Sequence, residues 1–274
     1  MSAGEAPAPT GFMSAGETPA STGFTPASPL PLPSKRHFVM TTAVIAAAGA
    51  GTRLGALGQR HSKAMVPIAG RPLIELTLDR FRTAGIWRVT IIINDASDDC
   101  RQWLRDHAGD FDLDLIVRTT PSSYASFQAV ADRLAATPAV ITTIDAVMPI
   151  NDFCTFVESA REFADNTVAL GLTDHVDDEN PLWATLGADG LIRQLGGGQG
   201  THVTAGLYWL PAQRPAEPTA SFARLRDYLG WLVAEQPPVC GIVLPRVFDI
   251  DRARDIAAAE AAEFGRKHEI VRRA

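Results

Sequence analysis

Short β-rich runs alternate with helical patterns from Thr41 onward, and this alternation constrains the fold more than any other feature of the sequence. The run TAVIAA from Thr42 to Ala47 is apolar, as is RVTIIIN from Arg88 to Asn94, and a segment with helical spacing follows each. Strands that alternate with helices are typical of crossover units and a parallel sheet. The sequence therefore predicts an α/β fold, with a Rossmann-like, mainly parallel twisted sheet flanked by helices.

The later elements are expected to continue this order. Helices are expected at 72–84, 98–107, 122–135, 152–164, 222–234 and 251–264, and strands at 113–118, 139–144, 167–172, 182–186, 191–195, 202–210 and 239–244. Gly-containing turns join the three strands between 182 and 210, which favours a small antiparallel insertion.

The first 38 residues differ in composition from the rest of the 274-residue chain. MSAGEAPAPTGF is followed directly by the near-repeat MSAGETPASTGF, in a segment rich in Ala, Pro, Gly, Ser and Thr. Such a segment buries too little apolar surface to offset the entropy lost on ordering. We expect a disordered low-complexity tail over 1–38 and a single domain over 40–270. A regulatory tail is the rival interpretation, and Met13 or Met40 is an alternative start.

Charge and cysteine content exclude several classes of function. The 25 basic and 31 acidic residues form no long run of one sign, which argues against nucleic acid as a partner. The chain has three cysteines, without a CxxC pair, which argues against a disulfide framework or a zinc site and favours the cytoplasm. No run reaches the roughly 18 apolar residues that a membrane span needs. The oligomeric state stays open, with a homo-oligomer among the alternatives.

The most informative stretch is AAAGAGTRLGALGQRHSKAMVPIAGRPLIE, from Ala46 to Glu75. Glycines after a strand let backbone N–H groups approach phosphate oxygens. A dinucleotide fingerprint would need glycine where Leu54 stands, and no Gly-Lys-Ser/Thr follows at P-loop spacing. A plain tight turn would explain the glycines but not Lys63. Lys63 is one of three lysines in a chain that otherwise uses arginine, which suggests that a compact point charge matters there.

These motifs resemble the nucleoside-diphosphate-sugar pyrophosphorylase and sugar-phosphate nucleotidyltransferase superfamily. They are the run G-x-G-T-R-L, a lysine about ten residues later, and V-P-I-x-G-x-P-L-I. The resemblance implies that Arg53 and Lys63 act catalytically on the phosphates of an NTP, and that Mg²⁺ is held by aspartates. It also implies a nucleotide-binding role for Ala47, Ala48, Gly49, Gly51 and Thr52.

Three aspartates are the candidate metal ligands. Asp145 follows the apolar run AVITTI, so we expect it at the carboxyl end of a central strand, where open α/β sheets bind ligands. The segment VFDIDRARDIAAAE resembles a late family segment whose leading acid completes the metal site, which implies Asp249 as a ligand. Asp251 is a second ligand or the cap of the last helix, and Asp255 is expected on the helix surface. The alternative for Asp145 is a structural role, in which it caps the turn that follows the strand.

Two further positions are candidates through the same resemblance. Ser123 lies where relatives place base-contacting groups, and Gly206 belongs to a segment that resembles the family's A-G-x-Y strand at the sugar pocket. A solvated helix start and a core strand are the respective alternatives. The family's E-K-P segment, whose lysine holds the sugar phosphate, is missing, so Arg193 or Arg246 is a candidate to supply that charge.

Together these features predict a nucleotidyltransferase that joins the NMP of an NTP to a sugar 1-phosphate and releases pyrophosphate. The absence of a proline after Leu54 moves the resemblance toward cytidylyltransferases of phosphorylated alcohols, which is the first alternative. A glycosyltransferase-like protein and a non-catalytic nucleotide-sugar-binding protein are the others. The expected partners are thus an NTP and a small phosphorylated substrate.

Overall fold

A computed structural model of the chain describes most of the region after Thr41. The described residues are 42–47, 54–55, 58, 60–134, 137–176, 180–213, 215, 222–235 and 238–261, with the backbone alone for 42–47. The tail expected over 1–38 lies outside them.

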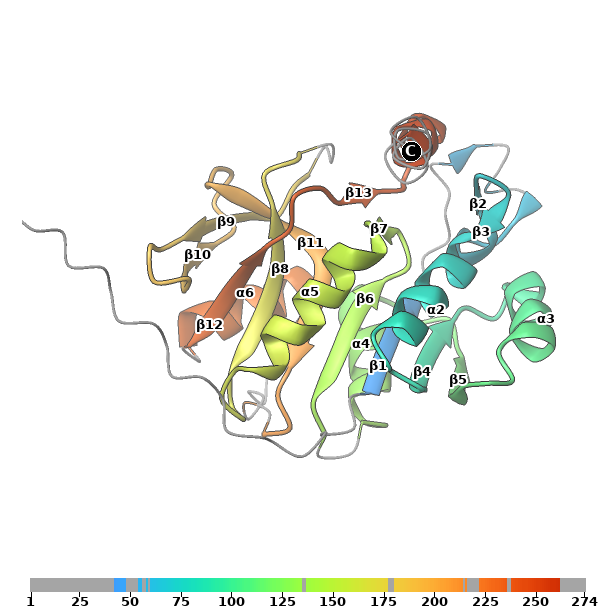
Figure 1. The fold of residues 1–274 in the computed structure, drawn as a ribbon, viewed down its shortest axis with the longest axis horizontal. Helices are drawn as coiled ribbons and strands as arrows, with labels where there is room; N and C mark the ends of the chain where they lie inside the picture. The colour runs from blue at the N-terminus through green and yellow to red at the C-terminus, as the bar shows by residue number, and fades with distance from the viewer. Residues whose placement is uncertain are drawn as a thin grey trace, which may run out of the picture. The chain divides into compact units, whose positions relative to one another are not determined.

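A nine-stranded sheet forms the centre of the described chain (Figure 1). In its parallel half, β1 (Thr42–Ala47) lies between β4 (Arg88–Ile93) and β6 (Ala139–Thr143), and β5 (Asp112–Val117) pairs with β4. The strand order β6-β1-β4-β5 means that the chain first builds outward on one side of β1 and then returns to its other side. Such a reversal is the point at which open α/β sheets bind ligands.

The other half of the sheet contains the antiparallel strands. β11 (His202–Leu210) pairs antiparallel with β6, with β8 (Val168–Thr173) and with β9 (Trp183–Leu186). β10 (Ile192–Leu195) continues from β9, and β12 (Val239–Val243) runs parallel to β8. The expected antiparallel segment is therefore present, and its pairing with β6 makes it part of the main sheet.

Helices cover the sheet and bury two separate hydrophobic cores. α2 (Leu73–Thr83), α3 (Asp98–His107) and α5 (Ile150–Arg161) contribute to one core, and α4 (Ser123–Ala131) and α6 (Leu225–Glu235) contribute to the other. In the view of Figure 1, α2 and α5 lie in front of the sheet. Among the described helices, none has the length and apolar character to cross a membrane.

The alternation of side chains along β4 explains why this run folds as a central strand. Val89, Ile91 and Ile93 belong to one core and Ile92 to the other, and all four are fully buried. Successive strand residues point to opposite faces, so an unbroken apolar run suits a strand that is covered on both sides. Burying each such side chain contributes about 1.5–3 kcal/mol.

Most expected boundaries agree with the structure to within a few residues. Gly85 ends α2 with a φ of 69°, as expected for a residue that follows a helix. α3 and β11 have the expected bounds, whereas α5 begins two residues before the expected 152. The hairpin of β2 (Pro67–Ile68) and β3 (Arg71–Pro72) is not predicted by the sequence.

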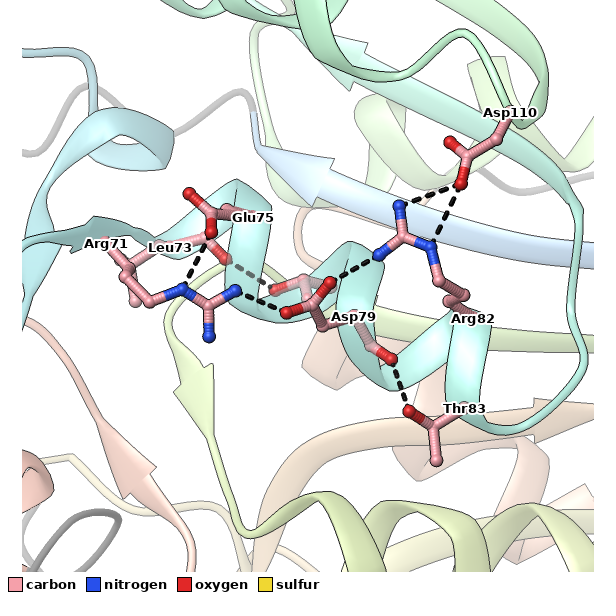
Figure 2. Close-up of polar contacts among 8 residues, drawn as sticks. Arg71, Leu73, Glu75, Asp79, Arg82, Thr83 and Asp110 are labelled. Carbon is pink, nitrogen blue, oxygen red and sulfur yellow. Dashed lines mark hydrogen bonds and ion pairs between the residues drawn. The ribbon is translucent and has the colours of Figure 1, made fainter.

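A chain of ion pairs follows the exposed side of α2 (Figure 2). Arg71 of β3 donates to Glu75 Oε1 at 2.7 Å and pairs with Asp79, which also pairs with Arg82. Arg82 reaches Asp110 Oδ2 at 2.9 Å, in the turn before β5. Partly exposed pairs of this kind contribute at most about 1 kcal/mol each. Their clearest effect is to tie the β2–β3 hairpin and the β5 turn to one helix.

Candidate active site

Asp145 lies just beyond the carboxyl end of β6, beside the point where the strand order reverses. The buried side chains of Val140 and Ile141 fix the strand in the two cores. The buried Arg80 of α2 donates from Nε to the carbonyl oxygen of Met148 at 2.9 Å, which holds the segment after Asp145. The carboxylate is left 23% exposed, so it is open to a ligand while its backbone is fixed.

A short ladder brings the late aspartates to Asp145. β7 (Ala146–Val147) follows Asp145 directly and pairs antiparallel with β13 (Phe248–Asp249), with Asp249 opposite Ala146. The N–H of the fully buried Ile250 donates to the carbonyl oxygen of Asp145 at 3.1 Å. Two carboxylates that are far apart in the sequence therefore become neighbours.

Asp255 fixes the backbone next to this ladder. Its Oδ2 accepts the N–H groups of Asp251 at 3.1 Å and of Arg252 at 2.7 Å, where the helix of residues 253–261 begins. This is the arrangement of a capping box, in which an acid at the third helical position satisfies N–H groups at the helix start. The Asp255 side chain is 11% exposed, so the expectation of a surface residue is wrong.

Lys63 belongs to η2 (Lys63–Met65), a single turn that is anchored at both ends. The N–H of Ser62 donates to Asp99 Oδ2 at 2.9 Å, in the first turn of α3. After the turn, Val66 is fully buried in the core. The turn therefore presents the Lys63 side chain, 8% exposed, toward the aspartates.

Lys63 makes two short ion pairs with the aspartates. Its Nζ donates to Asp145 Oδ2 and to Asp251 Oδ1, both at 2.6 Å. Burial disfavours the charged ammonium, but the charges and hydrogen bonds of Asp145 and Asp251 outweigh it and raise the pKa of Lys63 above its ordinary value. Lys63 is therefore positively charged at neutral pH.

The three aspartates form a cluster with the chemistry of a divalent-metal site. Asp145, Asp249 and Asp251 each offer a carboxylate oxygen, and these atoms lie within 4.8 Å of one another. Three carboxylates with one ammonium carry a net charge of about −2, which a divalent cation would balance. Mg²⁺ prefers carboxylate oxygens that leave room for water and phosphate. The donor set therefore fits Mg²⁺.

A cavity of about 240 Å³ opens beside the cluster. Asp145 and Asp249 lie in its lining, together with the basic residues Arg226 and His175. This volume is below the roughly 300–1,000 Å³ typical of pockets for drug-sized molecules, which suits a small ligand. The hydroxyl-bearing residues in the lining are Ser123, Thr143, Thr173, Thr204 and Tyr208.

Gly206 lets β11 pass close to the segment that carries Asp145. It has a φ of 63°, and a Cβ there would lie 2.5 Å from Thr143 Oγ1 and 3.0 Å from Ala146 Cβ. The register between β11 and β8 shifts between Thr204 and Tyr208, as at a β-bulge. Gly206 lies in the cavity lining, the region in which the sequence predicts substrate binding.

Ser123 also lines the cavity, but its hydroxyl has a structural partner. Ser123 Oγ accepts the N–H of Leu225 at 3.1 Å, which joins the start of α4 to the start of α6. The preceding residue, Ser122, caps α4 by accepting the N–H of Ala125. A contact of Ser123 with the nucleotide base stays a prediction.

The first loop lies outside the described residues, so its roles stay predictions. Ala47 is the last residue of β1, of which the structure describes the backbone. The other loop candidates are Ala48, Gly49, Gly51, Thr52 and Arg53.

The arginine in the cavity lining is one that sequence reasoning missed. The candidate Arg193 pairs with Asp189 at the β9–β10 turn, and Arg246 lies over the ring of Phe248, with 5.9 Å from its Cζ to the ring centroid. Arg226 is the arginine that lines the cavity. Its signal in the sequence is its place beside Leu225, which begins the buried stripe of α6. The stripe alone does not reveal what the helix faces.

Two solved structures share this fold. A candidate glucose-1-phosphate thymidylyltransferase from Bacillus anthracis, solved with sucrose, aligns with a TM-score of 0.70 at 15% identity, over 81% of this chain and 94% of that one. The inositol-1-phosphate CTP transferase from T. maritima aligns with a TM-score of 0.66 at 16% identity, over 81% and 97%. At these identities the likeness establishes the fold, which is of the nucleotide-diphospho-sugar transferase type that the sequence predicts.

Residues 43–209 match the family model of the MobA-like NTP transferase domain, which covers more than half of the chain. The chain belongs to this nucleotidyltransferase family. The matched region includes Lys63, Asp145 and Gly206, whereas Asp249 and Asp251 follow it. The predicted resemblance to nucleotidyltransferases is thereby confirmed.

Curated relatives with sequence similarity are nucleotidyltransferases of different acceptors. CMP-5'-(3-aminopropyl)phosphonate synthase of Streptomyces rubellomurinus is 27% identical over 170 residues, which is 53% of this chain and 26% of that protein. The 2-aminoethylphosphonate cytidylyltransferase of Lancefieldella rimae is 36% identical over 53 residues, 19% of this chain and 22% of its own. Glucose-1-phosphate thymidylyltransferase of Streptomyces griseus is 37% identical over 57 residues, 21% of this chain and 16% of its own. The matches span about a quarter or less of these relatives' lengths.

Proposed function

We propose that this member of the family transfers the nucleoside monophosphate of an NTP to a small phosphorylated acceptor, a sugar 1-phosphate foremost, and releases pyrophosphate. The observation that carries the proposal is the ammonium of Lys63, held 2.6 Å from each of two carboxylates in a three-carboxylate cluster beside a cavity. The acceptor would lie in that cavity, and the product belongs to nucleotide-sugar synthesis. A cytoplasmic location is part of the same proposal.

The reaction is one phosphoryl-group transfer. An oxygen of the acceptor phosphate forms a bond to the α-phosphorus of the NTP, and the bond from that phosphorus to the α,β-bridging oxygen breaks. The electron pair of the broken bond leaves on pyrophosphate. The attacking phosphate is already an anion, so no general base is needed. The rate then depends on alignment and on charge stabilisation.

The residues of the cluster have distinct roles in this proposal. Asp145, Asp249 and Asp251 would hold Mg²⁺. Asp145 and Asp249 are the main ligands in this proposal, and Asp251 completes or orients the site. When bound, Mg²⁺ would neutralise charge on the phosphate oxygens. Lys63, positively charged and nearly buried, stabilises the negative charge of the transferring phosphoryl group. Arg53 and the amides of the first loop are proposed to neutralise the pyrophosphate.

Cytidylyl transfer to a phosphonate or a phosphorylated alcohol is the second candidate. Two of the curated relatives are described as synthases or cytidylyltransferases of phosphonates, and the T. maritima structure is of a CTP transferase. A glycosyltransferase is less well supported, since a D-x-D motif is typical of that class and Ala146 and Val147 follow Asp145.

Pyrophosphate release from a panel of substrates tests the proposal. CTP, UTP, dTTP, ATP and GTP would each be combined with Mg²⁺ and glucose 1-phosphate, inositol 1-phosphate or 2-aminoethylphosphonate. We expect release that depends on acceptor and metal for at least one pair. Nucleotide binding without release from any pair would contradict transfer and favour a non-catalytic binding protein.

A further inference from the structure

We propose that Arg226 is an acceptor-binding residue and that it selects an acceptor whose distal part is rich in oxygen, as in a polyol or a hydroxy acid, over an aminoalkyl chain. This inference rests on the proposed function, since it names the substrate class of the same cavity. Arg226 would bind the distal part of the acceptor, a role different from that of the missing E-K-P lysine, which holds the sugar phosphate in the family that the sequence resembles.

The cavity lining contains both acidic and basic residues. Asp145 and Asp249 belong to the lining and also to the carboxylate cluster, whereas Arg226 enters the lining from α6. Tyr208, which is buried, lines the same cavity. Because the cavity has a volume of about 240 Å³, an acceptor that fills it with its phosphate at the cluster can contact Arg226 with its other end.

The fold holds Arg226 at this place. Leu225 and Leu229, which flank it on α6, are 8% and 3% exposed and also line the cavity. The N–H of Leu225 is bound by Ser123, as described above. Arg226 Nη2 donates to the carbonyl oxygen of Asn180 at 3.1 Å. A guanidinium carries five N–H donors in a planar fork, so one such tether fixes its direction and leaves donors for a ligand.

The chemistry of the lining decides between the two acceptor classes. Within the described residues of the lining, the acidic side chains are Asp145 and Asp249, and both belong to the metal cluster. An alkylammonium group offers donors alone and would meet the like charge of Arg226. Hydroxyl or carboxylate oxygens would accept hydrogen bonds from the guanidinium, whereas an ammonium cannot. The described side chains of the lining therefore favour an oxygen-rich acceptor.

The test is a kinetic comparison of three variants with whichever NTP supports pyrophosphate release. Arg226→Met should raise the acceptor KM about 10- to 100-fold, the loss expected for a hydrogen bond to a charged group, with the NTP KM unchanged. Arg226→Lys, which retains the charge, should recover part of this loss. Arg224→Met, which removes a neighbouring exposed arginine of the same region, should leave both KM values unchanged.

The acceptor panel completes the test. We expect glucose 1-phosphate or inositol 1-phosphate to be used with a higher kcat/KM than 2-aminoethylphosphonate, and Arg226→Met to narrow that difference. The inference is overturned, while the proposed function stands, if the aminophosphonate is the best acceptor. The inference on Arg226 is also overturned if Arg226→Met and Arg226→Lys leave the acceptor KM unchanged. The same holds if these variants lower kcat without a change in the acceptor KM. If the wild-type chain releases no pyrophosphate with any pair of NTP and acceptor, both proposals are overturned.

Discussion

Lys63 is the counter-ion of the aspartate cluster. Its ammonium lies between Asp145 and Asp251, while Asp249 completes the cluster. Without it, the partly buried carboxylates would repel one another, and Asp145 and Asp251 would each lose a charged hydrogen bond. Lysine supplies a compact point charge at a position that is only 8% exposed, whereas arginine has a larger planar head, which gives a physical reason for the lysine at this position.

Substitution of Lys63 by methionine tests both roles of the ammonium. In EDTA we expect the free energy of unfolding to fall by about 1–3 kcal/mol. Mg²⁺ should then stabilise the variant more than the wild type, because the net charge of the cluster changes from about −2 to −3. Pyrophosphate release should fall by about 100-fold or more, through loss of charge stabilisation.

Urea unfolding in EDTA and in Mg²⁺, with the release assay, provides these measurements. Arg88→Met is a suitable control, since it removes a half-exposed partner of Asp112 and should change stability by less than about 1 kcal/mol. Wild-type stability and wild-type activity in the Lys63 variant would contradict the account.

The elements that carry the site differ in how well the sequence predicts them. The long apolar run of β4 and the segment that ends at Asp145 are predictable, because their patterns are local. β7 and β13 have two residues each, too few for any periodicity, and their pairing depends on a register between distant segments. The sequence therefore predicts the identity of the aspartates by resemblance but not the ladder that joins them.

The roles of two more residues cannot be predicted from local sequence patterns. Asp255 reads as one more polar residue of a helix, and its role depends on where the backbone of Asp251 turns. Arg226 reads as a solvated residue of α6, and its role depends on which part of the sheet that helix faces. Both roles depend on tertiary contacts, so a local sequence pattern does not predict them.

The bulge of β11 gives a prediction at the scale of one strand. Gly206→Ala should lower the free energy of unfolding by about 2–3 kcal/mol, because the residue has a positive φ and the new Cβ would collide with Thr143 Oγ1. Gly230→Ala is the matched control. It lies in α6 with nothing within 4 Å of its Cβ position, so the helix should gain about 0.5–1 kcal/mol.

Urea denaturation of the two variants would be compared with the wild type. Equal stabilities for Gly206→Ala and Gly230→Ala would mean that β11 does not pass as close to Thr143 as described. A larger acceptor KM in Gly206→Ala would additionally connect the bulge to the cavity.

At the scale of the whole molecule, the site is assembled from segments that are far apart in the sequence. β6 and the segment after it provide Asp145, the η2 turn provides Lys63, and β13 with the residue two positions later provides the other carboxylates. The family match ends at residue 209, before Asp249 and Asp251. The last part of the chain is therefore needed for the complete cluster, and its removal should abolish the metal binding that we propose there.

A crystal structure of the chain with Mg²⁺ and a non-hydrolysable analogue of the preferred NTP tests the central claim most directly. We expect the metal about 2.0–2.1 Å from carboxylate oxygens of the cluster. We also expect the phosphates to lie at the carboxyl end of β1, with Lys63 Nζ within hydrogen-bond distance of a phosphate oxygen. Phosphates bound elsewhere, with Lys63 turned away from them and no metal at Asp145, would contradict the account.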